Sequence, residues 1–279
     1  MNLFRNTLPE IIRSEDVINK ILGDTKTHII CNRANDRLIG VSVLEDNTIY
    51  LLCVDKAFQH KGIGSKLLKQ SEDYIASAGH EKIVLGTGKE YIMPGVPMNR
   101  NVHNFFIKRG YNHSWGNTRC IDMEQELKDF HYSEHSVGDT IFGIKYRWAN
   151  INDLDKILVS LSDNETDFSP YYQNMNYYLE GSRERVVLAE MNDEILGTLV
   201  VSIEPACKGM GSLGLTATAR KHRNKGIATT LVMLATKYLK DIGMEKVHGS
   251  YTYSSLINMY SKTGLNVCME YFMGEKYLQ

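Results

Sequence analysis

The stretch VDKAFQHKGIGSKLL at residues 54–68 decides the fold of this chain, because it returns in altered form as TARKHRNKGIATTLV at residues 218–232. In each copy an apolar run ends, a glycine follows, and an amphipathic run begins at a small residue two places later. This order predicts a strand, a tight turn and a helix whose first amide groups can bind an anion. Two glycine turns without function are the alternative, and the repetition argues against it.

Length and composition are those of a globular protein with two domains. The 279 residues are 43% hydrophobic and 23% charged, and an offset of 164 residues relates Gly62 to Gly226. Domains cluster at roughly 100–150 residues, so each half can form one. The 32 basic and 33 acidic residues give a net charge of -1, which supplies no excess positive charge for nucleic acid. We therefore expect no nucleic-acid partner.

Signals for targeting and for metal binding are weak. No run reaches the roughly 18 apolar residues of a spanning helix, and the first residues lack a signal-peptide core. We therefore expect a cytoplasmic protein with no membrane partner. The five cysteines form no C-x-x-C pair, and His131 and His135 in the polar segment 124–139 have no third ligand candidate nearby. That segment is interpreted as a solvated connector, and no metal site is predicted.

Both halves show the same order of helical and strand patterns. In the first half, helices are predicted at 9–22, from 63 onward and at 102–108, strands at 27–31, 38–44, 48–54 and 82–85, and β structure from 111 through 123. In the second half, helices are predicted at 153–161, 229–242 and 255–263, and strands at 186–190, 195–203, 212–218, 247–251 and 265–272. The chain is therefore predicted to be an α/β protein (α+β, with mixed sheets). Its predicted parts are an N-terminal domain at 1–130, a linker at 131–140 and a C-terminal domain at 141–279.

The two glycine turns suit a pyrophosphate. The first amide groups of a helix have no partner inside the helix and lie at the positive end of its dipole. Gly62 and Gly64 lack Cβ atoms, so a ligand can approach the backbone closely. The chain has no G-x-x-x-x-G-K-[ST] motif, and Gly86-Thr87-Gly88 is not a dinucleotide fingerprint because Tyr91 occupies the third glycine position.

These residues resemble the GNAT superfamily of acyl-CoA-dependent N-acyltransferases, whose signature is [RQ]-x-x-G-x-[GA] between a strand and a helix. Gln59 to Gly64 and Arg223 to Ala228 both match it. The surrounding order of elements resembles the family over nearly the whole chain. The resemblance implies two tandem GNAT acyltransferase folds with acetyl-CoA (coenzyme A) as cofactor.

By this resemblance, the cofactor binds to a splayed strand and to the turn that follows it. In the first half the implied cofactor-binding residues are Val54, Gln59, His60, Lys61, Gly62, Ile63, Gly64, Ser65 and Asn99. In the second half they are Thr218, Arg223, Asn224, Lys225, Gly226, Ile227 and Ala228. Backbone groups at Val54 and Thr218 are expected to pair with the pantetheine arm.

The halves differ at the position of the catalytic acid. The family often carries an asparagine, a tyrosine seven residues later and a glycine four residues after that, and the tyrosine can protonate the departing thiolate. In the second half Tyr260 stands four residues before Gly264, although Tyr253 replaces the asparagine. In the first half Asn99 is present, but Phe106 takes the place of the tyrosine. Tyr260 is therefore the predicted catalytic residue, and a core tyrosine is the alternative.

Other roles stay open at this stage. Tyr91 and Tyr111 are substitutes for an acid in the first half, where a thiolate can also leave without one because its pKa is near 8.5. Glu90, Glu204 and His103 are candidates for a general base, and none is assigned. The segment 90–97 is found only in the first half, and is interpreted either as an exposed wall for substrate or as a rigid connector.

The predicted function is transfer of an acetyl group from acetyl-CoA to a small-molecule or peptide amine by direct attack in a ternary complex, because no activated cysteine is evident. The alternatives are an enzyme with only one active half and a catalytically silent acyl-CoA sensor. The acceptor stays open. A monomer with pseudo-dimeric halves and a homodimer fit the sequence equally well.

Overall fold

The computed structural model describes residues 2–8, 15–87, 92–164, 167–203 and 207–278. By compactness the chain separates into two units. The first unit comprises Met1–Ile121, Pro205–Cys207 and Met269–Gln279, and the second comprises Asp122–Glu204 and Lys208–Cys268. The division into 1–130, 131–140 and 141–279 stays a prediction about sequence domains, whereas both compact units combine segments that are distant in sequence.

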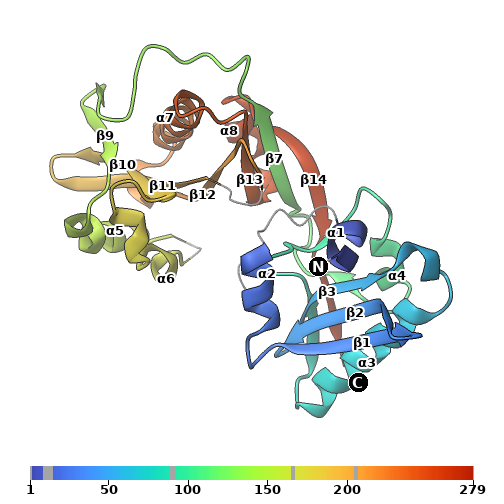
Figure 1. Ribbon diagram of the computed structural model, residues 1–279. Coiled ribbons are helices and arrows are strands. Elements are labelled where there is room, and N and C mark those ends of the chain that lie inside the picture. Colours follow the sequence, from blue (N-terminus) through green and yellow to red (C-terminus); the bar gives the residue numbers. More distant parts are fainter. Residues whose placement is uncertain (1, 9–14, 88–91, 165–166, 204–206, 279) are drawn as a thin grey trace. The chain divides into compact units, whose positions relative to one another are not determined.

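The first unit is a mixed sheet with helices packed against it (Figure 1). Its elements are α1 (Asn2–Thr7), α2 (Glu15–Leu22), β1 (His28–Ala34), β2 (Arg37–Glu45), β3 (Thr48–Val54), the 3₁₀ turn η1 (Lys56–Phe58), α3 (Ile63–Ser77), β4 (Lys82–Leu85), β5 (Val96–Pro97), α4 (His103–Ile107), β6 (Asn112–His113) and β15 (Gly274–Tyr277). The strand order is β1-β2-β3-β4-β15-β6. The α/β class with mixed sheets is confirmed, since β3 and β4 are parallel and their neighbours antiparallel.

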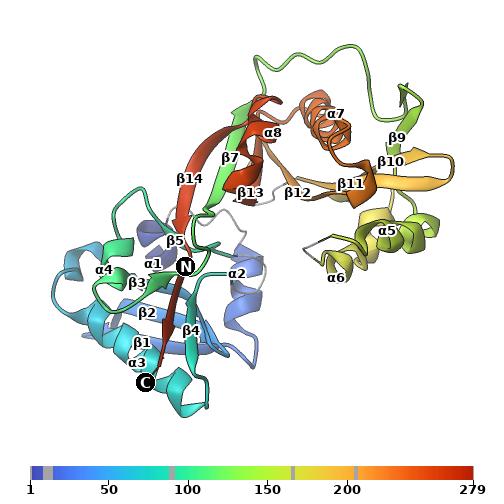
Figure 2. The ribbon, with the colours of Figure 1, turned by 180° about the vertical axis from the view of Figure 1, so that it is seen from behind.

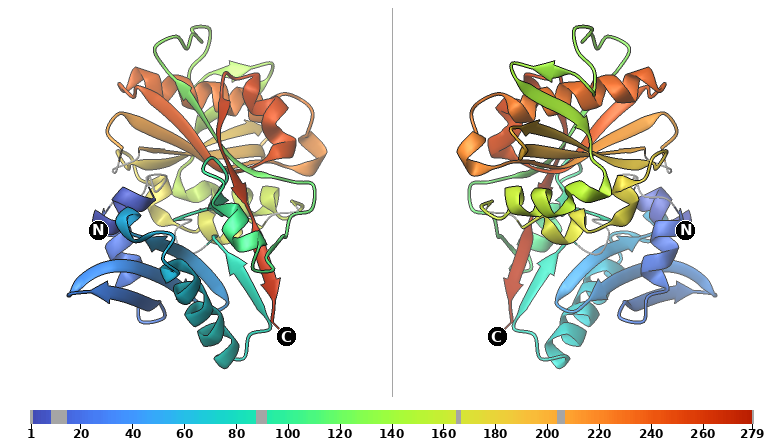
Figure 3. Two further views of the ribbon diagram at one scale, coloured as in Figure 1. Left: turned by 90° about the vertical axis from the view of Figure 1, so that its right-hand side faces the viewer. Right: turned by 90° about the vertical axis from the view of Figure 1, so that its left-hand side faces the viewer.

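The second unit repeats this architecture with longer strands. Its elements are β7 (Cys120–Glu126), β8 (Thr140–Ile141), β9 (Ile144–Trp148), η3 (Ile151–Asp153), α5 (Leu154–Leu161), α6 (Ser169–Tyr172), η4 (Met175–Tyr178), β10 (Glu184–Met191), β11 (Glu194–Ile203), β12 (Met210–Thr218), η5 (Arg220–His222), α7 (Ile227–Asp241), β13 (Lys246–Tyr253), η6 (Ser254–Leu256), α8 (Ile257–Ser261) and β14 (Asn266–Phe272). Its strands follow the order β14-β7-β13-β12-β11-β10-β9-β8. Helices α7 and α5 cover opposite faces of this sheet (Figure 3).

Each sheet contains a strand from the distant part of the sequence. β15, near the C-terminus, lies between β4 and β6, with Glu275 opposite Val84 and Gly274 opposite His113. β7, which precedes the connector, lies between β13 and β14, as the view from behind shows (Figure 2). The sequence pattern predicted β structure at 111–123 in one continuous stretch. The structure instead has two strands there, β6 and β7, which belong to different sheets.

Amphipathic helices build the two cores. α3 and α7 each span 15 residues and turn one apolar face toward their sheet, which buries Leu67, Leu68 and Ile75 in the first case and Leu231 and Leu239 in the second. Full burial of each such side chain stabilises the fold by roughly 1.5–3 kcal/mol. The cores therefore fix the N-termini of these two helices at the ends of β3 and β12.

Candidate functional site

Each unit contains one large cavity beside its glycine turn. The first cavity, of about 940 Å³, is lined by residues of β3, the turn, α4 and the segment that precedes α4. The second cavity, of about 1120 Å³, is lined by residues of β12, the turn, β13 and α8. Both are large enough to hold a cofactor of substantial size.

A splay between two parallel strands opens each cavity. β3 and β4 pair only at Thr48–Val84 and Ile49–Leu85, although β3 continues to Val54. β12 and β13 pair only at residues 210–212 and 246–248, although the strands run on to Thr218 and Tyr253. Beyond these registers the described parts of the facing backbone edges are not paired with each other, so they can form hydrogen bonds with an extended ligand.

The two glycine turns have the same backbone conformation. Gly62 has φ 79° and Gly226 has φ 78°, in the left-handed region that favours glycine. Apart from the glycine and its two chain neighbours, no atom of the described residues lies within 4 Å of the position where a Cβ atom would stand at either glycine. The first hydrogen bonds of α3 and α7 run from Lys66 to Gly62 (3.0 Å) and from Thr230 to Gly226 (2.9 Å). The earlier amide groups therefore lie before the helical ladder, beside open space, as a bound pyrophosphate requires.

The first residue of each signature closes the turn. Gln59 Nε2 donates a hydrogen bond to the Val54 carbonyl oxygen at 3.0 Å, and Arg223 Nε donates to that of Thr218 at 3.4 Å. Arg223 also donates from Nη2 to Asn164 Oδ1 at 2.6 Å. The sequence suggested a cofactor contact for Gln59 and Arg223. These hydrogen bonds show that both side chains also hold the strand end to the turn.

Two glycines that the sequence pattern did not single out bring each helix close to its sheet. A Cβ atom on Gly40 of β2 would lie 2.9 Å from Leu67 Cδ1, and one on Gly197 of β11 would lie 2.8 Å from the Ala217 carbonyl oxygen and 3.1 Å from Ile227 Cγ2. Gly40 stands opposite Val54, and Gly197 stands opposite Thr218. A glycine inside a strand pattern was the available signal, because it often marks close packing.

Most of the predicted cofactor residues lie at the cavities. Among the described residues, the first cavity is lined by Val54, Gln59, His60, Gly62, Gly64 and Ser65, and the second by Thr218, Arg223, Asn224, Gly226, Ile227 and Ala228. Lys61, Ile63, Lys225 and Asn99 are not among these lining residues. Lys61 Nζ instead donates to the Ala57 carbonyl, and Lys225 Nζ lies 3.5 Å from His222 Nδ1. Asn99 is exposed on a turn.

Tyr260 projects from α8 into the lining of the second cavity. Its hydroxyl donates a hydrogen bond to Thr216 Oγ1 on β12 at 3.2 Å. The side chain is 8% exposed, and burial raises the pKa of Tyr260, although the bond to Thr216 opposes this shift. Tyr260 is therefore protonated near neutral pH, as a proton donor must be. Thr216 was missed from the sequence, because nothing in β12 marks it as the partner of Tyr260.

The corresponding wall of the first cavity is aromatic and apolar. Phe106 is 7% exposed and packs edge-on against Phe105 and Tyr111. Phe105 approaches the position of a Cβ atom on Gly64 to 3.6 Å. The Arg109 guanidinium lies 3.8 Å from the centre of the Phe105 ring and donates to Ser65 Oγ at 2.7 Å. The first turn of α3 is therefore partly covered by side chains of α4 and its C-terminal end.

The remaining candidates from the sequence lie elsewhere. Tyr111 is buried and donates to Glu72 Oε1 at 3.1 Å, and burial and Glu72 raise the pKa of Tyr111. It does not line the first cavity. His103 Nδ1 is buried without a hydrogen-bond partner among the described residues. Glu90, Tyr91 and Glu204 lie outside the described residues.

The segment 90–97 is packed rather than exposed where it is described. Ile92 and Met93 are each 3% exposed, so the expectation that they form an exposed wall is wrong. Val96 and Pro97 form β5, which pairs with Phe272 and Tyr271 in the last residues of β14, a part of β14 that belongs to the first unit. Met93, Val96 and Pro97 nevertheless line the first cavity, and the segment thereby narrows it.

Cys53 and Cys268 do not have the character of activated nucleophiles. Burial raises the pKa of Cys53 to about 11. Partial desolvation of the sulfur and the nearby Glu124 and Asp122 carboxylates raise the pKa of Cys268 to about 12. Both therefore stay thiols near neutral pH, whereas covalent catalysis needs the thiolate.

Comparison of the sequence with known protein families agrees with two glycine turns in two similar folds. The model of the Acetyltransferase (GNAT) family matches residues 148–265, and that of the Acetyltransferase (GNAT) domain matches residues 4–89. No curated protein matches the sequence at a significant level. Within the described residues no helix is both long and apolar enough to cross a membrane.

Three solved structures illustrate the shared fold. One is the GCN5-related glucosamine N-acetyltransferase region of a fungal multi-domain GH3 β-N-acetylglucosaminidase, with TM-score 0.77, 19% identity and coverage of 98% of this chain but only 36% of that protein. Another is a GCN5-related N-acetyltransferase from Sphaerobacter thermophilus, with TM-score 0.69, 16% identity and coverage of 94% and 85%. The third is a tandem GNAT protein from the clavulanic acid biosynthesis pathway, with TM-score 0.67, 15% identity and coverage of 91% and 84%. At these identities the likeness concerns the fold.

Proposed function

Because the chain belongs to the GNAT acetyltransferase family and carries the fold twice in tandem, we propose that it transfers an acetyl group from acetyl-CoA to an amine, and that the second unit performs the chemistry. The observation that carries this proposal is the bond between Tyr260 and Thr216 at the wall of a cavity that also contains the Gly226 turn. The predicted domain boundaries and cofactor residues form part of the same proposal.

The cofactor would bind mainly through the backbone. Amide groups at residues 226–229 would hold the pyrophosphate, and each charge-assisted hydrogen bond contributes about 1.5–3 kcal/mol. The edge of β12 from residue 213 to Thr218 would pair with the pantetheine arm. Bound acetyl-CoA would supply the thioester carbonyl and the sulfur leaving group. Gly226 admits this ligand because the space at its missing Cβ atom is open.

Tyr260 would act as the general acid. Its Oη would hold the proton through the approach of the amine and donate it as the leaving sulfur develops charge. Thr216 would orient the hydroxyl. The described residues that line the second cavity include no carboxylate, so we propose that the ammonium substrate loses its proton to solvent water. Direct attack on the thioester fits the raised pKa values of Cys53 and Cys268.

The first unit would bind the cofactor more weakly or serve a structural role. Phe106 cannot donate a proton, and Phe105 and Arg109 cover part of the first turn of α3. An enzyme with one active half is therefore the favoured form of the proposal. A silent acyl-CoA sensor would bind the cofactor in either cavity and release no thiol with any amine.

The test is Tyr260→Phe, measured with a thiol-release assay on a panel of amines that includes amino acids, polyamines, aminoglycosides and glucosamine. Glucosamine is included because one of the similar structures is a glucosamine N-acetyltransferase region. The variant is expected to lose about 10²- to 10⁴-fold in kcat, as is usual for loss of a general acid, with CoA affinity within about twofold. Tyr171→Phe, on the exposed part of α6 in the same unit, is the matched control.

Unchanged turnover in Tyr260→Phe would assign the acid elsewhere. An absence of thiol release with every amine, together with cofactor binding, would favour the sensor.

A further inference from the structure

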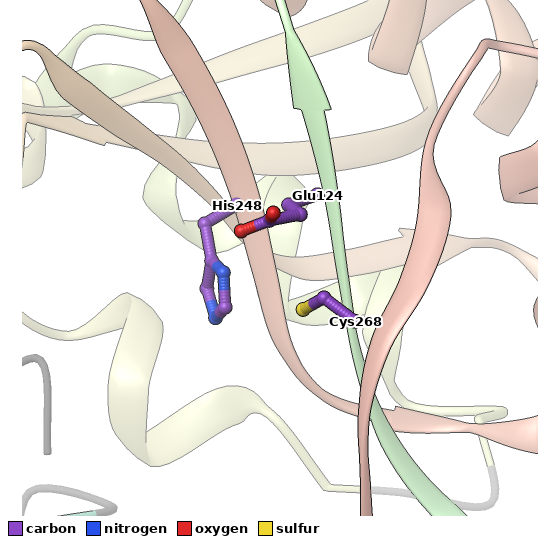
Figure 4. A group of neighbouring side chains, drawn as sticks. All are labelled: Glu124, His248 and Cys268. Carbon is purple, nitrogen blue, oxygen red and sulfur yellow. The ribbon is translucent and has the colours of Figure 1, made fainter. Parts of the chain in front are cut away.

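Three potential metal ligands meet on the second sheet, outside the residues that line the second cavity. Glu124 belongs to β7, His248 to β13 and Cys268 to β14. β7 lies between the other two strands, so the three side chains come from adjacent strands. One ligand atom of each lies within 4.8 Å of the others, and the Glu124 carboxylate and the Cys268 sulfur both point toward the side of the His248 ring (Figure 4).

The strongest indication of a ligand at this cluster is the environment of His248. It is 5% exposed, and neither ring nitrogen has a hydrogen-bond partner among the described residues. Its Nε2 lies 3.4 Å from Asp122 Oδ2, but without the geometry of a hydrogen bond. Asp122 Oδ1 accepts hydrogen bonds from Ser250 Oγ and the Tyr251 amide. A buried polar group without a partner costs about 1–3 kcal/mol, and a coordinated metal ion would remove that cost.

The ligand types and their spacing fit zinc. A point can be found that lies about 2.8 Å or less from three atoms separated by at most 4.8 Å, and small side-chain rotations would shorten this distance to the roughly 2.0–2.3 Å of zinc–ligand bonds. Imidazole and thiolate favour zinc over magnesium or calcium. Cys268 is exposed, so a water molecule can complete a tetrahedral site.

The neighbouring Lys246 leaves room for this site. Its Nζ lies 3.1 Å from Glu124 Oε1 and 3.0 Å from Glu126 Oε1. Coordination needs only the second oxygen of Glu124, so the ion pair and the metal bond can coexist. Lys246 would lower the affinity by its charge, and Asp122 and Glu126 would oppose that effect.

We propose that Glu124, His248 and Cys268 form a zinc site that joins β7 to β13 and β14. The ion would hold β7, which precedes the connector in sequence, in the sheet of the second unit. Because metal binding to the folded state alone stabilises that state, zinc would raise the melting temperature of the chain. The site is independent of the proposed acyl transfer.

The test titrates the tag-free full-length chain with Zn²⁺ against a chromogenic chelator, and with Co²⁺ as a spectroscopic probe. We expect one ion per chain and a thiolate-to-cobalt absorption band. Cys268→Ser should abolish that band and weaken zinc binding at least tenfold, and Glu124→Gln should weaken zinc binding at least tenfold while the band persists at higher Co²⁺. Cys31→Ser, which replaces an exposed cysteine of the first unit, should match the parent in both measurements.

Circular dichroism without metal identifies any variant that fails to fold. If one of Cys268→Ser and Glu124→Gln does not fold, the zinc affinity of the other tests the proposal. The proposal is overturned if the parent binds less than half an equivalent of zinc, or if Cys268→Ser keeps the thiolate band. It is also overturned if either folded variant binds zinc within twofold of the parent.

Discussion

The two cavities share a glycine turn of the same conformation but differ in the wall that faces it. Gly62 and Gly226 have φ values of 79° and 78°, and the side chains of Gln59 and Arg223 return to the preceding strand in the same way. Across the cavity, however, Tyr260 bonds to Thr216 in the second unit, whereas Phe106 packs among rings in the first.

This difference separates features that the fold of each half requires from features that one half can lose while keeping its fold. The turn is defined by backbone conformation, on which the packing of α3 and α7 also depends, so its loss would disturb the core. The proposed acid depends on one hydroxyl and its partner. The position 164 residues before Thr216 is Leu52, so the first unit lacks both members of the pair. Its fold can persist without them.

The largest expected difference between the two units is the loss of cofactor affinity when a side chain is added at one glycine turn. Gly226→Val should place a branched side chain in the space proposed for the pyrophosphate, and disturb at least two charge-assisted hydrogen bonds. Each contributes about 1.5–3 kcal/mol, so cofactor affinity should fall by about 100-fold or more. Gly62→Val should change turnover less than twofold. Calorimetric titration with acetyl-CoA and the thiol-release assay measure the two effects.

The matched controls are Gly243→Val and Gly79→Val. Both glycines have φ 85°, and no atom of the described residues lies within 4 Å of the position where a Cβ atom would stand, so these variants carry the same backbone strain away from the turns. They should lower the melting temperature and keep affinity. If Gly226→Val kept the full thermal shift with acetyl-CoA, the cofactor would have to bind elsewhere. The Gly62→Val/Gly226→Val double variant should show no shift at all.

A smaller effect is expected from the residue that closes each turn. Arg223→Leu removes the bonds to the Thr218 carbonyl and to Asn164, and should weaken acetyl-CoA binding about tenfold, since hydrogen bonds of charged groups contribute about 1.5–3 kcal/mol. Gln59→Leu removes one neutral bond, and should alter binding at the first unit only. Lys225 is a cation in the same turn that does not line the cavity. Lys225→Leu therefore removes a positive charge and leaves the hydrogen bonds of Arg223 in place. Equal losses in Arg223→Leu and Lys225→Leu would show that charge alone matters.

The pH dependence of turnover tests the state of Tyr260. Its pKa is raised by burial, so the phenol keeps its proton at pH values where an unperturbed tyrosine, with a pKa near 10, begins to ionise. The activity that depends on this proton is therefore present below pH 10 and is lost only as pH rises through the higher folded-state value. Steady-state kcat should show no alkaline fall between about pH 8 and 10. A midpoint below 10 that disappears in Tyr260→Phe would contradict the raised pKa.

The sequence predicted the features that depend on local pattern. Apolar periodicity located α3 and α7, and glycine spacing located the two turns, because both depend on neighbouring residues. The spacing of Tyr260 and Gly264 singled out a tyrosine that lines the second cavity, and its role as the acid stays a prediction. The same family pattern predicted a cofactor contact for Asn99, but the structure places Asn99 on an exposed turn, outside the residues that line the first cavity.

Long-range partners could not be predicted from pattern. Alternation in a strand tells which face is buried but not which strand lies beside it, so the pairing of β15 with β4 and the entry of β7 between β13 and β14 had no local signal. The role of Thr216 could not be predicted for the same reason, since its hydrogen-bond partner Tyr260 lies 44 residues away in the sequence. Glu124 and His248 come together only because β7 joins the second sheet.

The smallest expected effect concerns Phe106. In the Tyr260→Phe background, Phe106→Tyr would add a hydroxyl to a cluster of rings where Leu52 offers no hydrogen-bond partner. A buried hydroxyl without a partner costs about 1–3 kcal/mol, so the variant should melt earlier while kcat changes less than twofold. Phe106→Leu, which adds no polar group, is the control for altered packing. Recovery of more than a tenth of parental kcat by Phe106→Tyr would mean that the first cavity aligns thioester and amine, and lacks only the proton donor. Continued inactivity would mean that the loss extends to the wall itself, because a donor at the correct position in sequence still has no partner to orient it.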